Sequence, residues 1–516
     1  MRFYCHENTL CQKTPYKNII FMLKQKFLIQ FGSNFILKIV GMIAGVVVAR
    51  VAGPEVVGII AFGTAYVGVF GFITGLFGTG HIKAISEGKD LGKCISTYTL
   101  LQGSSIALYS IVVMGWFLFH KFVLNYEFES REQQIVIPIL LVAHVASLIL
   151  DFGNSTFTAR LEQAKANYAV FIKSIIWHIG RVVLVVLGFR AVGLASWNMI
   201  ITILAIPLAW RFLKRLPWGG FSKELAKKYW LIALPVFLIV IINSLIAYSD
   251  KLILAHFTSV EELGYYSAAF AIGGIFLLIS RAVGMIFFPL FSELISKKQW
   301  DIVNKKIQTF LNFVTLFIFP SLCAMAIIGK PLLLYVLGIK YQPSVNPFIV
   351  LLFATYVEII GMPYGNVITG MGKFNLVVLL NFFKLIVFVV CIIYFVSPNY
   401  LGLGAIGLAL NLFIVNIFMN VLFYVFAFHF GKMKLDVLNI KRHGITIILA
   451  LCVYSIINVY KINQEYWWIL TGILFIAISY LLLFVFRFIN SNDINHLINL
   501  LKIKNTHQYI KEEFRV

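Results

Sequence analysis

Residues 49–58 read ARVAGPEVVG, and this stretch closes one long apolar segment and opens the next. A second stretch, AHFTSVEELG at residues 255–264, stands between two later apolar segments. An offset of 206 residues aligns the two stretches and pairs Ala49 with Ala255, Glu55 with Glu261, and Gly58 with Gly264. The coincidence of Glu-x-x-Gly between equivalent segments predicts an internal duplication.

The composition is that of a membrane protein. Of the 516 residues, 60% are hydrophobic and 12% are charged, and the mean hydropathy is +0.90. Soluble domains carry about 25% charged residues, so this chain is too apolar to cover a surface that faces water. The formal net charge of +22 does not indicate nucleic acid as a partner, because the basic residues lie mainly between the apolar segments.

The apolar segments predict an all-α polytopic fold of about fourteen transmembrane helices, since about 20 helical residues cross a bilayer core. The expected spans are 28–50, 56–79, 95–119, 134–157, 168–189, 192–212, 231–256, 263–289, 309–336, 346–370, 374–396, 402–428, 443–460 and 466–488. Basic residues alternate between their connections. About thirty lie on the side of both tails and about seven on the other side. Both termini are therefore expected in the cytoplasm of a bacterial inner-membrane protein.

Each repeat unit holds six spans, an even number, so both copies start on the same side of the membrane. Such parallel repeats form two lobes with a substrate site between them. The expected organisation is a tail at 1–27, an N-lobe at 28–213, a basic linker at 214–230, a C-lobe at 231–428, an extra helix pair at 443–488 and a tail at 489–516.

Several ionisable side chains fall inside the spans, where each costs about 3 kcal/mol. Four basic ones lie deep, namely Lys38, Lys251, Arg281 and Lys384. A cavity lined by these cations would attract an anionic headgroup. Snorkelling and mutual pairing are the alternatives, and snorkelling suits Asp151 and Lys173. Asp250 and Lys251 point about 100° apart on a helix, so direct pairing between them is not expected.

Two polar amides complete the candidate site, and the absence of catalytic motifs bears on the class of protein. Asn34 and Asn243 lie within spans and could bind sugar hydroxyls. The chain has no P-loop and no HExxH, and its cysteines and histidines are scattered. No external connection is long enough for a catalytic domain. The sequence therefore predicts a transporter and not an enzyme, with no cofactor and no metal site.

Three motifs resemble the polysaccharide transporters of the multidrug/oligosaccharidyl-lipid/polysaccharide exporter superfamily, close to the O-antigen flippases. They are Arg50-x-x-Gly53-Pro54-Glu55-x-x-Gly58, Ser249-Asp250-Lys251-x-x-Leu254, and Glu262-Leu263-Gly264-Tyr265-Tyr266-Ser267-x-Ala269. The resemblance covers roughly residues 28–430 and implies two six-helix lobes around a cationic lumen. The added pair at 443–488 resembles that of the lipid II flippases, where it forms a groove for the lipid tail.

The resemblance implies a flippase for an undecaprenyl-pyrophosphate-linked oligosaccharide, such as an O-antigen or capsule repeat unit. Its pyrophosphate is expected on Arg50, Lys251 and Arg281, with Lys38 and Lys384 in support and Asn34 and Asn243 on the glycan. Asp250 or Glu358 is expected to couple transport to an ion. Expected partners are membrane lipids and a polysaccharide polymerase with its chain-length regulator, but no nucleic acid. A drug/cation antiporter of the same architecture and a membrane glycan polymerase are the alternatives.

Overall fold

The computed structural model describes residues 36–125, 127–160, 162–431, 437–459 and 464–485. Every regular element in these ranges is helical, which confirms the predicted all-α fold. Eleven described helices are long and apolar enough to cross a membrane. The exact count of fourteen spans is not confirmed. The span expected at 28–50 lies partly outside the described residues, and the helix expected at 443–460 opens with polar side chains.

The N-lobe begins with a helical segment over residues 36–52. Its further helices are α2 (Pro54–Gly68), α3 (Gly78–Ser86), α4 (Leu91–Phe122), α5 (Arg131–Leu150), α6 (Phe152–Ala159), α7 (Gln163–Val186) and α8 (Ala191–Leu213). The short α3 stands between two candidate spans, at the end that the charge pattern places in the cytoplasm.

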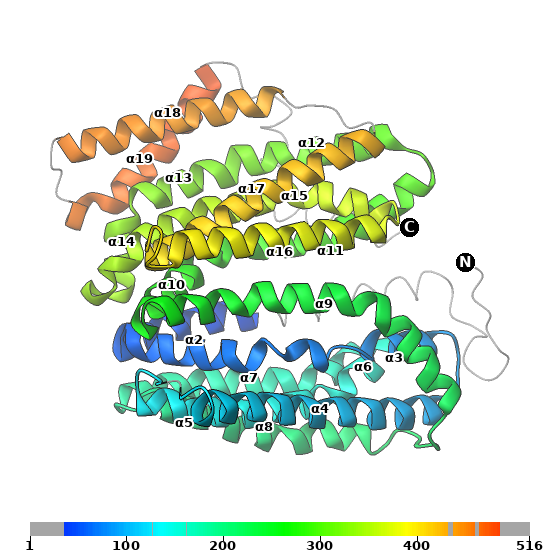
Figure 1. The fold of residues 1–516 in the computed structure, drawn as a ribbon. Helices are drawn as coiled ribbons and strands as arrows, with labels where there is room; N and C mark the ends of the chain where they lie inside the picture. The colour runs from blue at the N-terminus through cyan, green and yellow to red at the C-terminus, as the bar shows by residue number, and fades with distance from the viewer. Residues whose placement is uncertain (1–35, 126, 161, 432–436, 460–463, 486–516) are drawn as a thin grey trace.

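The C-lobe holds α9 (Lys223–Phe257), α10 (Val260–Gly273), α11 (Leu277–Ser296), α12 (Trp300–Phe313), α13 (Phe319–Ile327), α14 (Gly329–Leu337), α15 (Val345–Gly370), α16 (Phe374–Val396) and α17 (Gly404–Gly431). The added pair is α18 (Val437–Val459) and α19 (Gln464–Val485), which packs on α13. Figure 1 shows the N-lobe below the C-lobe, with α18 and α19 on the outer side of the C-lobe.

The second span of each lobe is interrupted in the same way. A turn of 3₁₀-helix, Gly71–Ile73, follows α2, and another, Gly274–Phe276, follows α10. The two interruptions fall within a few residues of each other under the 206-residue offset. This shared break supports the predicted duplication, and it explains why the span expected at 263–289 divides into α10 and α11.

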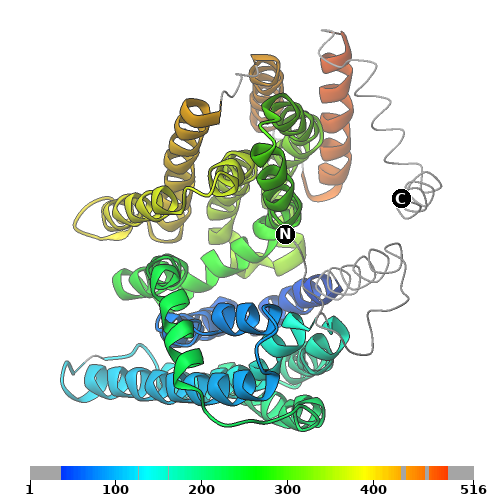
Figure 2. The same cartoon turned by 90° about the vertical axis from the view of Figure 1, so that its right-hand side faces the viewer.

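Helix α9 packs on both lobes, although the sequence assigns it to the C-lobe. Its first turns bury Leu225, Tyr229 and Ala233 in a cluster with Phe77 and Tyr98 of the N-lobe. Its last turns lie in the large core beside α16 and α17. The two views show α9 running along the boundary between the lobes (Figures 1 and 2).

A buried histidine connects the first part of α9 to the N-lobe through hydrogen bonds. His81 is fully buried on α3, where its Nε2 shares a hydrogen bond with Thr156 Oγ1 at 2.8 Å. Its Nδ1 shares one with the Tyr229 hydroxyl of α9 at 3.3 Å. The ring stacks on Tyr98, with the two centroids 4.2 Å apart. Burial lowers the pKa of His81 to about 3, from its ordinary value of 6.5.

This depressed pKa predicts a loss of stability in mild acid. Between pH 6.5 and pH 3 the unfolded chain binds a proton at His81 that the folded chain does not bind. At pH 5 the free energy of unfolding should therefore be lower by about 2 kcal/mol than at pH 7.5. Thermal unfolding in nanodiscs at both pH values measures this difference. His81→Gln should reduce the acid sensitivity, whereas His429→Gln, at an exposed position, should leave it unchanged.

Candidate functional site between the lobes

The two lobes meet where α2 crosses α10. A methyl group added to Gly58 would overlap the carbonyl oxygen of Val260, and one added to Gly264 would overlap the carbonyl oxygen of Pro54. Gly58 and Gly264 are equivalent in the repeat, and so are Pro54 and Val260. The contact is therefore reciprocal, as at a two-fold interface. Only glycine allows backbones to come this close.

Polar contacts surround this crossing at the end that the charge pattern predicts to be external. Arg50 Nη1 donates to the carbonyl oxygen of Tyr335 at 2.6 Å. The Tyr341 hydroxyl donates to the carbonyl oxygen of Ala49 at 3.0 Å. In the other direction, the Val260 backbone N–H donates to the Glu129 carboxylate at 2.9 and 3.0 Å. In each lobe, the connection between the third and fourth spans thus forms hydrogen bonds with the other lobe.

At the opposite end the first turns of α9 pack on α3 and α4 of the N-lobe. Helix α3 packs on α4, α6 and α9, while α11 packs on α12 and α15. The lobes are therefore joined by the reciprocal crossing on the side predicted to be external, and by α9 at the other end.

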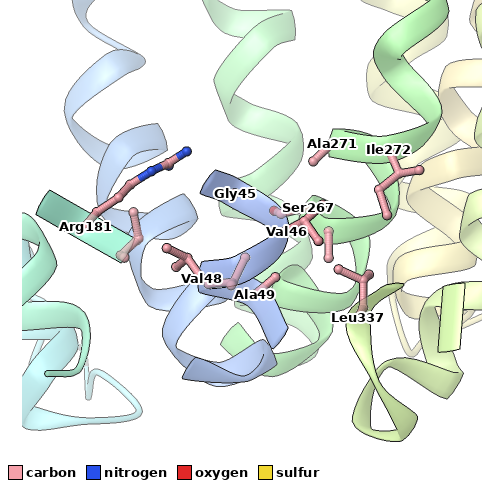
Figure 3. A pocket seen from close by; sticks show the side chains of 12 residues that line it. Gly45, Val46, Val48, Ala49, Arg181, Ser267, Ala271, Ile272 and Leu337 are labelled. Carbon is pink, nitrogen blue, oxygen red and sulfur yellow. The ribbon is translucent and has the colours of Figure 1, made fainter. Parts of the chain in front are cut away.

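A cavity of about 160 Å³ lies beside the crossing, between the lobes. Figure 3 shows the labelled lining residues of segment 36–52 and α10 facing each other, with Arg181 approaching from α7. Most of the lining is small and apolar, including Gly45, Ala49, Ala268 and Ala271. The two polar side chains in the lining are Arg181 and Ser267.

Arg181 is held in place but retains an unused donor. Its Nη2 donates to the carbonyl oxygen of Gly41 at 2.6 Å, and its guanidinium carbon lies 4.4 Å from the ring centre of Trp177. Its buried Nε has no hydrogen-bond partner, and neither does the buried Oγ of Ser267. Unsatisfied buried polar atoms are uncommon, and at a cavity they mark where an anionic or hydroxylated group could bind.

The sequence missed Arg181 as a site residue. It showed an arginine inside the span expected at 168–189, and depth in the span was the only available signal. The direction in which the Arg181 side chain points depends on how α7 packs against segment 36–52. The periodicity of the sequence does not predict that packing.

None of the expected basic residues whose side chains are described lines this cavity. Arg50 is exposed at the external end and contacts α14. Lys38 is exposed on segment 36–52, and Asn243 is exposed on α9. Asn34 lies outside the described residues. Arg281 stands on α11, but its side chain is not among those described.

One of the expected cations, Lys251, forms an ion pair with a carboxylate. Lys251 Nζ lies 3.0 and 3.2 Å from the two carboxylate oxygens of Asp250 and donates to the carbonyl oxygen of Ala247 at 2.8 Å. The expectation that these neighbours do not pair was therefore wrong, because the long lysine side chain folds back along the helix. Lys384 lies half-buried on α16, on the same helix face as the buried Leu380 and Phe388.

No group of three or more His, Cys, Asp or Glu side chains in the described ranges could hold a metal ion. The cavity between the lobes offers the unpartnered polar atoms of Arg181 and Ser267 instead.

Comparisons with known proteins agree with this architecture. The structure resembles that of the lipid II flippase MurJ in an inward closed conformation, with a TM-score of 0.68 and 15% identity over 89% of this chain and 99% of that one. It also resembles a multidrug resistance MATE family transporter of the MOP superfamily in its inward-facing conformation, with a TM-score of 0.58 and 16% identity over 75% of this chain and 93% of that one.

Sequence comparisons identify the family. An uncharacterized membrane protein in the cps region of Klebsiella pneumoniae is 24% identical over 420 residues, which cover 79% of this chain and 83% of that protein. A model of the family described as "Polysaccharide biosynthesis protein" matches residues 30–346. The predicted resemblance is confirmed, and the chain belongs to this polysaccharide biosynthesis family.

Proposed function

We propose that the protein is a flippase that moves a lipid-linked oligosaccharide across the bacterial inner membrane by alternating access. The observation that carries this proposal is the reciprocal crossing of α2 and α10, which joins two repeat-related lobes. Two rigid bodies joined in this way can rock about their contact and expose the space between them to either side in turn.

The chemistry between the lobes fits a charged headgroup better than a hydrophobic drug. Arg181 offers an unused N–H donor in a site shielded from water, where a contact with a phosphate oxygen is stronger than in water. Ser267 supplies a hydroxyl for a phosphate or a sugar. The lipid chain of such a passenger is proposed to remain in the bilayer while the headgroup passes between the lobes.

The proposal also includes the basic, amide and acidic side chains that were predicted from the sequence. Arg50, Lys251 and Arg281 are proposed to contact the pyrophosphate during transit, with Lys38 and Lys384 in support. Asn34 and Asn243 are proposed to contact the glycan, and Asp250 and Glu358 to take part in ion coupling. A phosphate is attracted to such a pathway over long range, because clefts with one sign of charge focus the field. An undecaprenyl-pyrophosphate-linked O-antigen or capsule repeat unit is the proposed passenger.

Reconstitution tests the proposal directly. Proteoliposomes containing the purified protein receive a fluorescent undecaprenyl-pyrophosphate oligosaccharide in one leaflet, and an added glycosidase reports how much reaches the other. The proposal requires transfer well above that of protein-free vesicles. A polyprenyl phosphate without sugar and a cationic dye serve as competing passengers. Transport of the dye alone would favour the drug/cation antiporter.

A further inference from the structure

Two charged side chains of the N-lobe reach helix ends of the C-lobe beside the crossing of α2 and α10. The Glu129 carboxylate accepts from the backbone N–H of Val260, the first residue of α10, at 2.9 and 3.0 Å. Arg50 Nη1 donates to the carbonyl oxygens of Tyr335 and Val336, in the last turn of α14, at 2.6 and 3.4 Å. An anion thus contacts a helix start and a cation contacts a helix end. Each charge matches the partial charge of the terminus that it contacts.

The C-terminus of α14 has no cation of its own, because its last turn contains no basic residue. Gly338 follows the helix with a φ of 94°, and its N–H donates to the carbonyl oxygen of Leu334 at 2.9 Å. That bond satisfies only one of the carbonyls that a helix end leaves without a partner inside the helix. Arg50 of the other lobe supplies a donor to the next two carbonyls in the chain.

The first turn of α10 also takes its contact from the other lobe. Ser259 and Glu262 have the spacing of a capping box, in which the glutamate returns to the start of its own helix. The Ser259 hydroxyl accepts from the Glu262 backbone N–H at 3.1 Å. The Glu262 carboxylate, however, accepts from the backbone N–H of Ala405 in the first turn of α17 at 3.0 Å. The carboxylate on the first N–H of α10 is therefore that of Glu129 in the N-lobe.

The repeat does not allow the reverse arrangement. Pro54 stands at the position of α2 that corresponds to Val260 of α10. Proline has no backbone N–H, so a carboxylate of the C-lobe would find no donor at this residue. The C-lobe contacts the carbonyl oxygen of Ala49 with the neutral hydroxyl of Tyr341 instead. The charges of these contacts therefore belong to the N-lobe, and the capped helices belong to the C-lobe.

We propose that Arg50 and Glu129 form an electrostatic latch that closes the lobes on the external side and weakens as the external ionic strength rises. Both side chains are exposed, so mobile ions screen their attraction to the helix ends. The close backbone contact at Gly58 and Gly264 carries no net charge and lacks this dependence. Outward opening must separate both charged contacts, because both lie between the same two lobes. This inference rests on the alternating access of the proposed function.

A distance measurement tests the latch without transport. Spin labels at Val123 and Tyr400, exposed positions on the predicted external side of the two lobes, report closure of the full-length protein in nanodiscs. Glu129→Gln and Arg50→Gln should each raise the fraction of long distances about threefold, because each removes one charge from a helix end. Glu129→Lys and Arg50→Glu place the opposite charge there and should raise it about tenfold. For the wild-type protein, an increase in salt from about 0.1 M to about 1 M should raise it about threefold.

A doubly reversed variant, which combines Glu129→Lys with Arg50→Glu, separates this latch from an ordinary ion pair. Exchange of the two charges would restore an ion pair between them. Here it leaves each charge at a helix end of the same sign, so the double variant should open more than either single variant. Glu127→Gln and Arg131→Gln, which remove exposed charges close to Glu129 in the chain, are the matched controls and should leave the distances unchanged.

A double variant that returns to the wild-type distance distribution would overturn the inference. So would a wild-type distribution that does not respond to salt, a measurement that needs no charge variant and is unaffected by misfolding of one. The distances are measured without the passenger, so loss of passenger binding at Arg50 cannot imitate an open latch. Distances that respond as expected, in a protein that does not transfer lipid-linked saccharide, would overturn the proposed function alone.

Discussion

Gly58→Leu is expected to abolish transport and to separate the external ends of the lobes. Even the first carbon of the new side chain would overlap the Val260 carbonyl oxygen, and backbone atoms cannot yield as a flexible side chain can. Overpacking of a close contact costs about 1–3 kcal/mol or more, which is enough to shift a balanced equilibrium between two conformations by about fivefold to more than a hundredfold. The closed arrangement should therefore be lost.

Spin labels at the exposed positions Val51 and Ile339 report the separation by their distance distribution. Because the crossing is reciprocal, Gly264→Leu should give the same increase in distance as Gly58→Leu. Gly115→Leu is the matched control, since nothing lies within 4 Å of a side chain at that position of α4. A distance distribution that Gly58→Leu leaves unchanged would show that this crossing does not hold the lobes together.

Arg181→Gln is expected to reduce transport about a hundredfold while the protein stays folded. Glutamine keeps a hydrogen-bond donor but removes the charge, and a charged hydrogen bond in a shielded site is worth about 1.5–3 kcal/mol. Initial rates in proteoliposomes measure the loss. Arg181→Lys should retain part of the activity, because the charge remains while the planar contact with Trp177 is lost.

Arg190→Gln is the control for that experiment. Arg190 is an exposed arginine outside the candidate spans and pairs with Glu55 and Glu132. Exposed pairs of this kind contribute little, so transport should change less than twofold. Wild-type rates in Arg181→Gln would remove Arg181 from the passenger's path.

Hydropathy, charge alternation and the duplicated stretch at 49–58 and 255–264 were sufficient to predict the helical fold, and the resemblance of three motifs indicated the family. They succeed because the bilayer imposes length and polarity on every span, whatever its neighbours are. The 3₁₀ turn at Gly274–Phe276 was not predictable in the same way. A break in a helix that keeps its apolar composition leaves the hydropathy unchanged.

The candidate site was harder to predict, because a sequence gives the depth of a charge and not its partner. Lys251 was taken as a cation without a direct partner, yet it folds back on Asp250. Arg181 received no role, although its guanidinium lies beside the cavity between the lobes. Both outcomes depend on rotamers and on helix rotation, which are set by packing between helices distant in the chain.

Helix α9 is continuous over 35 residues and bends between its first turns and the remainder (Figure 1). Its first turns lie in the His81 cluster and its last turns in the core beside α16. Because one continuous helix packs on both lobes, a displacement at one of its ends is passed on to the other. Weakening the packing of Tyr229 should therefore alter the position of the lobes at the opposite surface of the membrane, even in molecules whose contacts at that surface are intact.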